Sequence, residues 1–131
     1  MEYLEDFIKI TRTKEEVNLL PPLTLAYVGD SIYELYIRTN LINQTNHKPH
    51  KLHIETIKYV KAKSQAELLA KIYENLTEEE KDIVRRGRNA QNHHLPKNVS
   101  VTEYMHATAF ETLIGYLYLS RQYKRLDEIL K

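Results

Sequence analysis

The sequence has no cysteine and no tryptophan, and it contains only three glycines and four prolines among 131 residues. The absence of cysteine excludes disulfides, a thiolate nucleophile and a cysteine-based zinc site. The scarcity of glycine and proline leaves long stretches of chain without helix-breaking residues. The sequence also lacks an apolar run of membrane-spanning length and a segment of the signal-peptide type. We therefore expect a cytoplasmic protein with no membrane partner.

The composition is that of a globular protein. Hydrophobic residues make up 42% of the chain and charged residues 28%, and a chain of this length can bury a core of its own. We expect a single domain spanning residues 1–131. The 19 basic and 18 acidic residues nearly cancel, so the net charge of +1 indicates no class of partner. The distribution is more informative, because basic residues gather between residues 85 and 97.

Apolar residues recur every three to four positions rather than every second position, which predicts an all-α fold, a helical bundle. The longer helices are predicted over residues 24–43, 51–61 and 102–119, and a short amphipathic helix over residues 123–130. Four hydroxyl residues are followed three positions later by glutamate, the spacing of a capping box at a helix start. These four are Thr13, Ser64, Thr77 and Ser100.

An acidic residue lies within the most apolar of these segments, residues 23–38. Leu25, Val28 and Ile32 mark one apolar face, and Asp30 lies on the opposite side among further apolar residues. A helix that is apolar almost all round is expected to be enclosed by other elements. Stripping a carboxylate of water without a partner costs on the order of several kcal/mol. Asp30 therefore needs a cation, a hydrogen-bond network or a solvent-filled cleft.

The predicted helix near the C-terminus has the same character, with Glu111 opposite an apolar side. Small residues flank both acids and would let the two backbones approach closely; they include Ala26, Gly29, Thr108 and Gly115. Asp30 facing Glu111 would form an oxygen-rich site suited to Mg²⁺ or Mn²⁺. Such a metal activates water and stabilises charge on a phosphodiester. Spacing alone leaves open that each acid is satisfied by a nearby Tyr, Lys or Arg.

The residues around the two acids resemble the ribonuclease III family. Residues 25–35, LAYVGDSIYEL, are similar to the signature helix of its catalytic domain, and residues 108–117, TAFETLIGYL, are similar to its second acidic motif. Between them, residues 62–67 and 86–90 resemble the compact bacterial branch called Mini-III. The resemblance extends from about residue 20 to about residue 119, and the motifs occur in the order of the family.

The resemblance implies a Mg²⁺-dependent endonuclease that cuts double-stranded RNA as a homodimer, with part of the signature helix facing the second subunit. Asp30 would be the main catalytic and metal-binding residue, and Glu111 the second ligand. The implied substrate is the precursor of the large-subunit (23S) ribosomal RNA, with a ribosomal protein as a possible presenter. Two of the family's four acids are replaced here, by Ala26 and Thr108. Waters or a neighbouring acid would then complete the metal shell.

The basic residues are the expected RNA contacts, because we expect no double-stranded-RNA-binding domain beside the catalytic domain. Apart from Lys63, they lie within or next to residues 91–99, which are mostly polar and are predicted to form an exposed loop. The predicted phosphate contacts are Lys63, Arg85, Arg86, Arg88, His93 and Lys97. Without the family, such a cluster is as often a solvated helix end. The alternative for the whole chain is a catalytically silent RNA-binding module of the same fold.

Overall fold

In the computed structural model, residues 7–90 and 99–131 are described, and among them there are helices and no strand. The elements are α2 (Lys14–Asn18), α3 (Pro22–Gln44), α4 (Pro49–Val60), α5 (Ala62–Ile72), a 3-10 turn (Tyr73–Asn75), α6 (Glu78–Arg88), α7 (Val101–Leu119) and α8 (Tyr123–Leu130). The predicted all-α fold is confirmed. Within this part of the chain, no helix combines the length and the apolar character that crossing a membrane requires.

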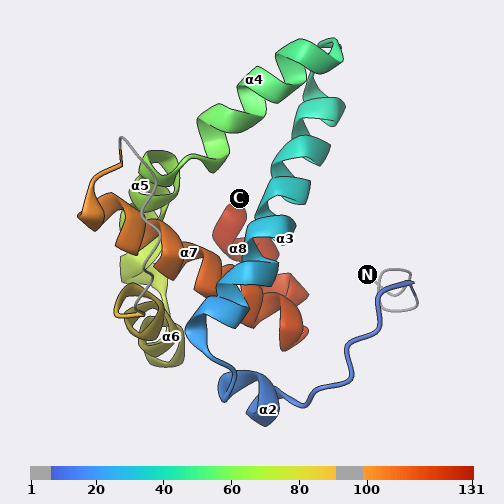
Figure 1. The fold of residues 1–131 in the computed structure, drawn as a ribbon. Helices are drawn as coiled ribbons and strands as arrows, with labels where there is room; N and C mark the ends of the chain where they lie inside the picture. The colour runs from blue at the N-terminus through green and yellow to red at the C-terminus, as the bar shows by residue number, and fades with distance from the viewer. Residues whose placement is uncertain (1–6, 91–98) are drawn as a thin grey trace.

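Helix α7 is the centre of the bundle. From Ala107 to Tyr118 every residue except Glu111 is buried. Helices α3, α5 and α6 all pack against it, and Figure 1 shows α3 crossing α7 while α5 and α6 lie on the other side of it. Glu111 is therefore the one interruption in the buried stretch, and the core on either side fixes its backbone.

Helices α3 and α7 cross at two glycines. A Cβ atom on Gly29 would lie 1.9 Å from the backbone oxygen of Glu111, and a Cβ atom on Gly115 would lie 1.8 Å from that of Leu25. Because neither place has room for a side chain, the two backbones are in direct contact. The predicted close approach is confirmed, and it places Asp30, the residue after Gly29, beside Glu111.

The capping boxes predicted at Thr13 and Thr77 are formed in full. Ser100 Oγ also accepts a hydrogen bond from the backbone N–H of Glu103, at 3.0 Å. Each of these hydroxyls satisfies a backbone donor that has no partner within its own helix. Three of the four predicted helix starts are therefore correct to within a residue or two.

The helix start predicted at Ser64 is wrong. Helix α5 begins at Ala62, after the single linking residue Lys61. Ser64 consequently lies within the first turn of α5, and its Oγ donates to the backbone oxygen of Lys58 at 2.5 Å. The hydroxyl of Ser64 binds the end of α4 instead of capping α5. It can do so because the last carbonyl groups of α4 lie within hydrogen-bonding distance.

Helix α3 is less enclosed than its sequence predicts. Tyr27 is 82% exposed, Leu35 58% and Ile42 64%, and their spacing places them on one side of the helix. Asp30 is exposed as well. The expectation of a helix surrounded on all sides is wrong for the single chain, because the helices packed on α3 leave this side open. Its apolar residues form a candidate contact surface.

Candidate active site

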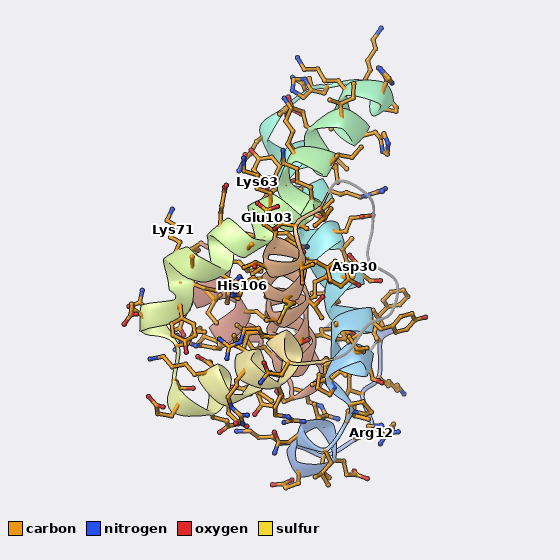
Figure 2. The ribbon with its side chains drawn as sticks, turned by 60° about the vertical axis from the view of Figure 1, so that its left-hand side comes forward. Arg12, Asp30, Lys63, Lys71, Glu103 and His106 are labelled. Atoms are coloured by element: carbon orange, nitrogen blue, oxygen red, sulfur yellow. The ribbon has the colours of Figure 1, made fainter. Side chains whose placement is uncertain are left out.

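Two carboxylates meet where α3 crosses α7. Asp30 follows Gly29, which packs directly on the backbone of Glu111, and the two acidic side chains are in hydrogen-bonding contact. Figure 2 labels Asp30 on α3, next to α7. The fold thus brings together the two acids on which the sequence analysis centred, one exposed to solvent and one partly buried.

The environment of Glu111 disfavours its ionised form. Burial above all, followed by the hydrogen bond and the negative charge of Asp30, raises the pKa of Glu111 from 4.5 to about 8. A hydrogen bond from Gln65 acts in the opposite direction. At neutral pH the metal-free pair therefore keeps a proton on Glu111. A divalent cation between the two carboxylates would relieve their repulsion and displace that proton, so the pair fits a metal.

Gln65 is a site residue that the sequence analysis missed. Its side chain is 2% exposed, although glutamine is mostly found at protein surfaces. Its Nε2 donates to Glu111 Oε2 at 3.5 Å. The residue belongs to the motif at residues 62–67 that carried part of the family resemblance, but a motif does not reveal which of its side chains faces an acid.

The two positions at which further acids were expected belong to the helix packing. Ala26 and Thr108 are each 7% exposed, and the backbone oxygen of Thr108 accepts a hydrogen bond from Thr112 Oγ1 at 2.7 Å. No group of three or more His, Cys, Asp or Glu side chains that could hold a metal occurs among the described residues. Two carboxylates alone would then supply the described protein ligands, with water filling the remaining positions.

Most of the predicted RNA contacts lie on α5 and α6. Lys63 is exposed in the first turn of α5, two residues before Gln65. Arg88 is partly exposed at the end of α6 and lines a surface depression together with His106. Arg85 is exposed and forms an ion pair with Asp82 of its own helix. These positions leave the basic side chains accessible from solvent.

Arg86 has a different environment. Its guanidinium donates to the backbone oxygens of Asn18 at 2.9 Å and Leu20 at 3.3 Å, and to Asn18 Oδ1 at 3.2 Å. These bonds tie α6 to the last residue of α2 and to the segment that leads into α3. Arg86 therefore has a clear role in the fold itself. The predicted contacts His93 and Lys97 lie outside the described residues.

The stability of the metal-free protein is expected to fall as the pH rises. The pKa of Glu111 is about 8 in the folded chain against an ordinary value of 4.5, so the folded state holds this proton more tightly than the unfolded state. This contribution is present in full at acid pH and is lost as the pH rises through about 8. Between about pH 6 and about pH 8, wild type should lose about 2 kcal/mol more than Glu111→Gln.

Urea unfolding in a chelator at the two pH values measures this difference. Glu111→Gln is the reference for wild type, because the amide retains the shape of the glutamate side chain and has no proton to lose between the two pH values. Equal losses in the two proteins would contradict a raised pKa at Glu111.

Comparison with known sequences shows which family the chain belongs to. The profile of the Ribonuclease III domain matches residues 23–122. The chain is a member of the ribonuclease III family. The predicted family is thereby confirmed, and so is the predicted fold. Membership makes the chain an endoribonuclease, a hydrolase that cleaves double-stranded RNA.

Relatives of this ribonuclease III protein point to one branch of the family. It is 56% identical to Mini-ribonuclease 3 of Thermoanaerobacter over 91% of this chain and 84% of that protein. Identity to Mini-ribonuclease 3 of Symbiobacterium thermophilum is 47%, covering 86% of both chains. Identity to that of Staphylococcus aureus is 46%, covering 87% of both. The predicted membership of the Mini-III branch is confirmed.

A solved structure agrees with this assignment. The crystal structure of a Fusobacterium nucleatum protein matches with a TM-score of 0.78 at 34% identity, over 85% of this chain and 88% of that chain. Enzymes of the ribonuclease III family depend on divalent metal ions and typically act as dimers. Family membership favours catalysis over the alternative of a silent RNA-binding module.

Proposed function

We propose that Asp30 and Glu111 hold the divalent cation of this ribonuclease III enzyme, Mg²⁺ or in its place Mn²⁺. The observation that carries the proposal is the contact between the two carboxylates, which with burial raises the pKa of Glu111 to about 8. The described hydrogen-bond partners of Glu111 are Gln65 and Asp30. Neither partner carries a positive charge that would compete with a cation for this carboxylate.

Glu111 and Asp30 would have different roles because they differ in burial. Glu111 is anchored by the core residues of α7, while Asp30 is exposed to the solvent from which RNA approaches. A cation held by both would lower the pKa of a bound water and offset charge on the scissile phosphodiester. Ala26 and Thr108 are occupied by helix packing, so in this proposal water molecules complete the shell.

We propose that the RNA backbone lies along the α5 side of this pair. Lys63 is the exposed residue of the first turn of α5, and Lys58 and Lys61 precede it, also exposed. Arg85 and Arg88 continue the basic surface on α6. Side chains of this kind bind phosphates and recognise the shape of a duplex rather than its sequence. His93 and Lys97 remain predictions from the sequence.

Replacing Lys63 by glutamine is expected to weaken the salt dependence of RNA binding. Losing one phosphate contact lowers the slope of log affinity against log salt by about 0.7 to 0.9. Fluorescence anisotropy with duplex RNA measures the slope, using protein that also carries Asp30→Asn so that the RNA is not cut. Lys71→Gln is the matched control, an exposed lysine of the same helix two turns further on (Figure 2). Lys71→Gln should keep the slope of the parent protein, and a Lys63→Gln slope equal to that of the parent protein would place the RNA elsewhere.

We propose that the enzyme is a homodimer that associates through the open apolar side of α3. The exposed aromatic and aliphatic residues there, Tyr27, Leu35 and Ile42, form a surface of the kind that is rarely left uncovered. A two-fold axis beside α3 would place two copies of the carboxylate pair near one cleft, each to cut one strand. Leu35→Lys should shift the protein to monomers in sedimentation velocity, and a variant that stays dimeric would exclude this contact.

The proposed substrate is the base-paired precursor of large-subunit ribosomal RNA, as the membership of the Mini-III branch suggests, and the proposed location is the cytoplasm. The test is incubation with a duplex from the precursor ends and with an unrelated duplex of equal length, in Mg²⁺ and in a chelator. Mg²⁺-dependent cuts at defined positions of the precursor are expected. Cutting of the unrelated duplex alone would exclude this substrate.

The same assay tests the remaining alternatives. No cleavage of either duplex under any condition would favour the silent RNA-binding module. Cleavage that appears only after large-subunit ribosomal proteins are added would show that one of them presents the RNA.

A further inference from the structure

We infer that Gln65 is a positioning residue for Glu111, whose carboxylate it orients toward the cation. The inference rests on the proposed function of the Asp30–Glu111 pair. Gln65 is 2% exposed, and burying an amide without a partner costs about 1–3 kcal/mol in proteins. The described hydrogen bond of its side chain is the one that Nε2 donates to Glu111 Oε2. The amide is therefore buried in order to face this carboxylate.

The placement of Gln65 follows from the packing of α5. Its backbone N–H donates to the backbone oxygen of Lys61 at 3.1 Å, in the first turn of the helix. Leu69, one turn later, is 4% exposed and belongs to the apolar core, so Gln65 and Leu69 share the inward face. On the inward face of α5, Gln65 lies opposite Glu111, which is the one residue from Ala107 to Tyr118 of α7 that is not buried. The side-chain amide of α5 is thus paired with the carboxylate of α7.

An amide suits this position better than a charged group. A lysine or arginine would neutralise Glu111 and compete with the cation, and a further acid would add repulsion to the pair. The neutral N–H fixes Glu111 Oε2 and leaves the charge of the carboxylate available. The carboxylate of Glu111 is then held in place and stays available to a cation shared with Asp30. Groups that orient metal ligands in this way typically contribute 10- to 100-fold to metal affinity.

The test is Mn²⁺ binding, measured by electron paramagnetic resonance without RNA. Gln65→Met has a side chain of similar length and no donor, and it should weaken Mn²⁺ binding by about 10-fold or more. Gln122→Met is the matched control, because Gln122 Nε2 donates to Ser120 Oγ at 2.8 Å and has no described contact with the carboxylate pair. It should leave Mn²⁺ affinity unchanged. In cleavage assays Gln65→Met should lower kcat while the KM for RNA is retained.

A double-mutant cycle separates positioning from general stability. In a Glu111→Gln background, Gln65→Met should have no further effect on Mn²⁺ affinity, because Gln65 acts through Glu111. Additive losses, an unchanged affinity in Gln65→Met, or an equal loss in Gln122→Met would each overturn the inference. If Gln65→Met gives no cooperative melting transition, Gln65→Asn replaces it, since it keeps an amide but withdraws it from Oε2.

The same measurements distinguish this inference from the proposal on which it rests. Retained Mn²⁺ binding in both Asp30→Asn and Glu111→Gln would overturn the metal site itself. Weakened but measurable Mn²⁺ binding in those two variants, together with wild-type affinity in Gln65→Met, would overturn only the role of Gln65.

Discussion

Replacing Asp30 by asparagine is expected to lower the rate of RNA cleavage by at least about 1,000-fold, because charge stabilisation by a bound metal contributes several kcal/mol to the barrier. The amide retains the size of the side chain but removes the charge that binds the cation. Asp30 is exposed, so the fold should be unaffected. Single-turnover cleavage of a labelled duplex in saturating Mg²⁺ measures the effect.

Glu34→Gln is the matched control for this prediction. Glu34 lies on the same helix four residues later, and its carboxylate forms an ion pair with Arg38 at 2.9 Å. Exposed pairs of this kind contribute about 1 kcal/mol or less, and the pair has no described contact with Glu111. The control should cleave RNA at close to the wild-type rate. An Asp30→Asn enzyme as active as the control would show that the chemistry takes place elsewhere.

Replacing Gly115 by alanine is expected to destabilise the protein by at least about 3 kcal/mol, which lowers Tm by about 10 °C in a domain of this size. The added methyl group would lie 1.8 Å from the backbone oxygen of Leu25. A backbone atom cannot turn aside as a side chain can, so α3 and α7 must separate. Separation would also move Asp30 away from Glu111, and RNA cleavage should fall together with stability. Thermal unfolding and cleavage are measured on the same samples.

Thr102→Ala controls for the addition of an alanine to the same helix. Thr102 is exposed near the start of α7, where alanine is the better helix former. Its Tm and activity should be equal to those of wild type or slightly higher. A Gly115→Ala protein with unchanged Tm would contradict the direct contact of the two backbones.

The sequence predicted that Asp30 and Glu111 lie side by side because both acids and the glycines near them have a local signature. Asp30 and Glu111 are conspicuous as acids in apolar helices, and Gly29 and Gly115 lie close to them in sequence. A glycine in a helix is unfavourable unless another element needs the space, so glycines next to two isolated acids indicate where two helices meet. Apolar periodicity located the helices for the same reason, since one face of each must be buried.

Other features depend on neighbours that a single segment does not reveal. Ser64 has the spacing of a helix cap, but its hydroxyl donates to a backbone oxygen at the end of α4 instead. Gln65 is polar and gives no periodic signal, and only the packing of α5 on α7 shows that it faces Glu111. Arg86 belongs to a basic cluster in sequence, while in space its guanidinium joins α6 to Asn18 and Leu20.

The open side of α3 could not be predicted from the sequence for a different reason. Apolar residues all round a helix predict that it is enclosed, but they do not tell whether the enclosing surface belongs to the same chain. Tyr27 and Leu35 are exposed in the single chain. We expect a second copy to cover them, which would reconcile the pattern in the sequence with the structure.

The most direct test of the carboxylate pair is anomalous diffraction from crystals grown in Mn²⁺. One strong anomalous peak is expected at the crossing of α3 and α7, within coordination distance of Asp30 and Glu111, with Gln65 still donating to Glu111. The peak should be absent from crystals of Asp30→Asn. A peak bound by other residues, or no peak in crystals whose dissolved protein cleaves RNA with Mn²⁺, would contradict a metal site at Asp30 and Glu111.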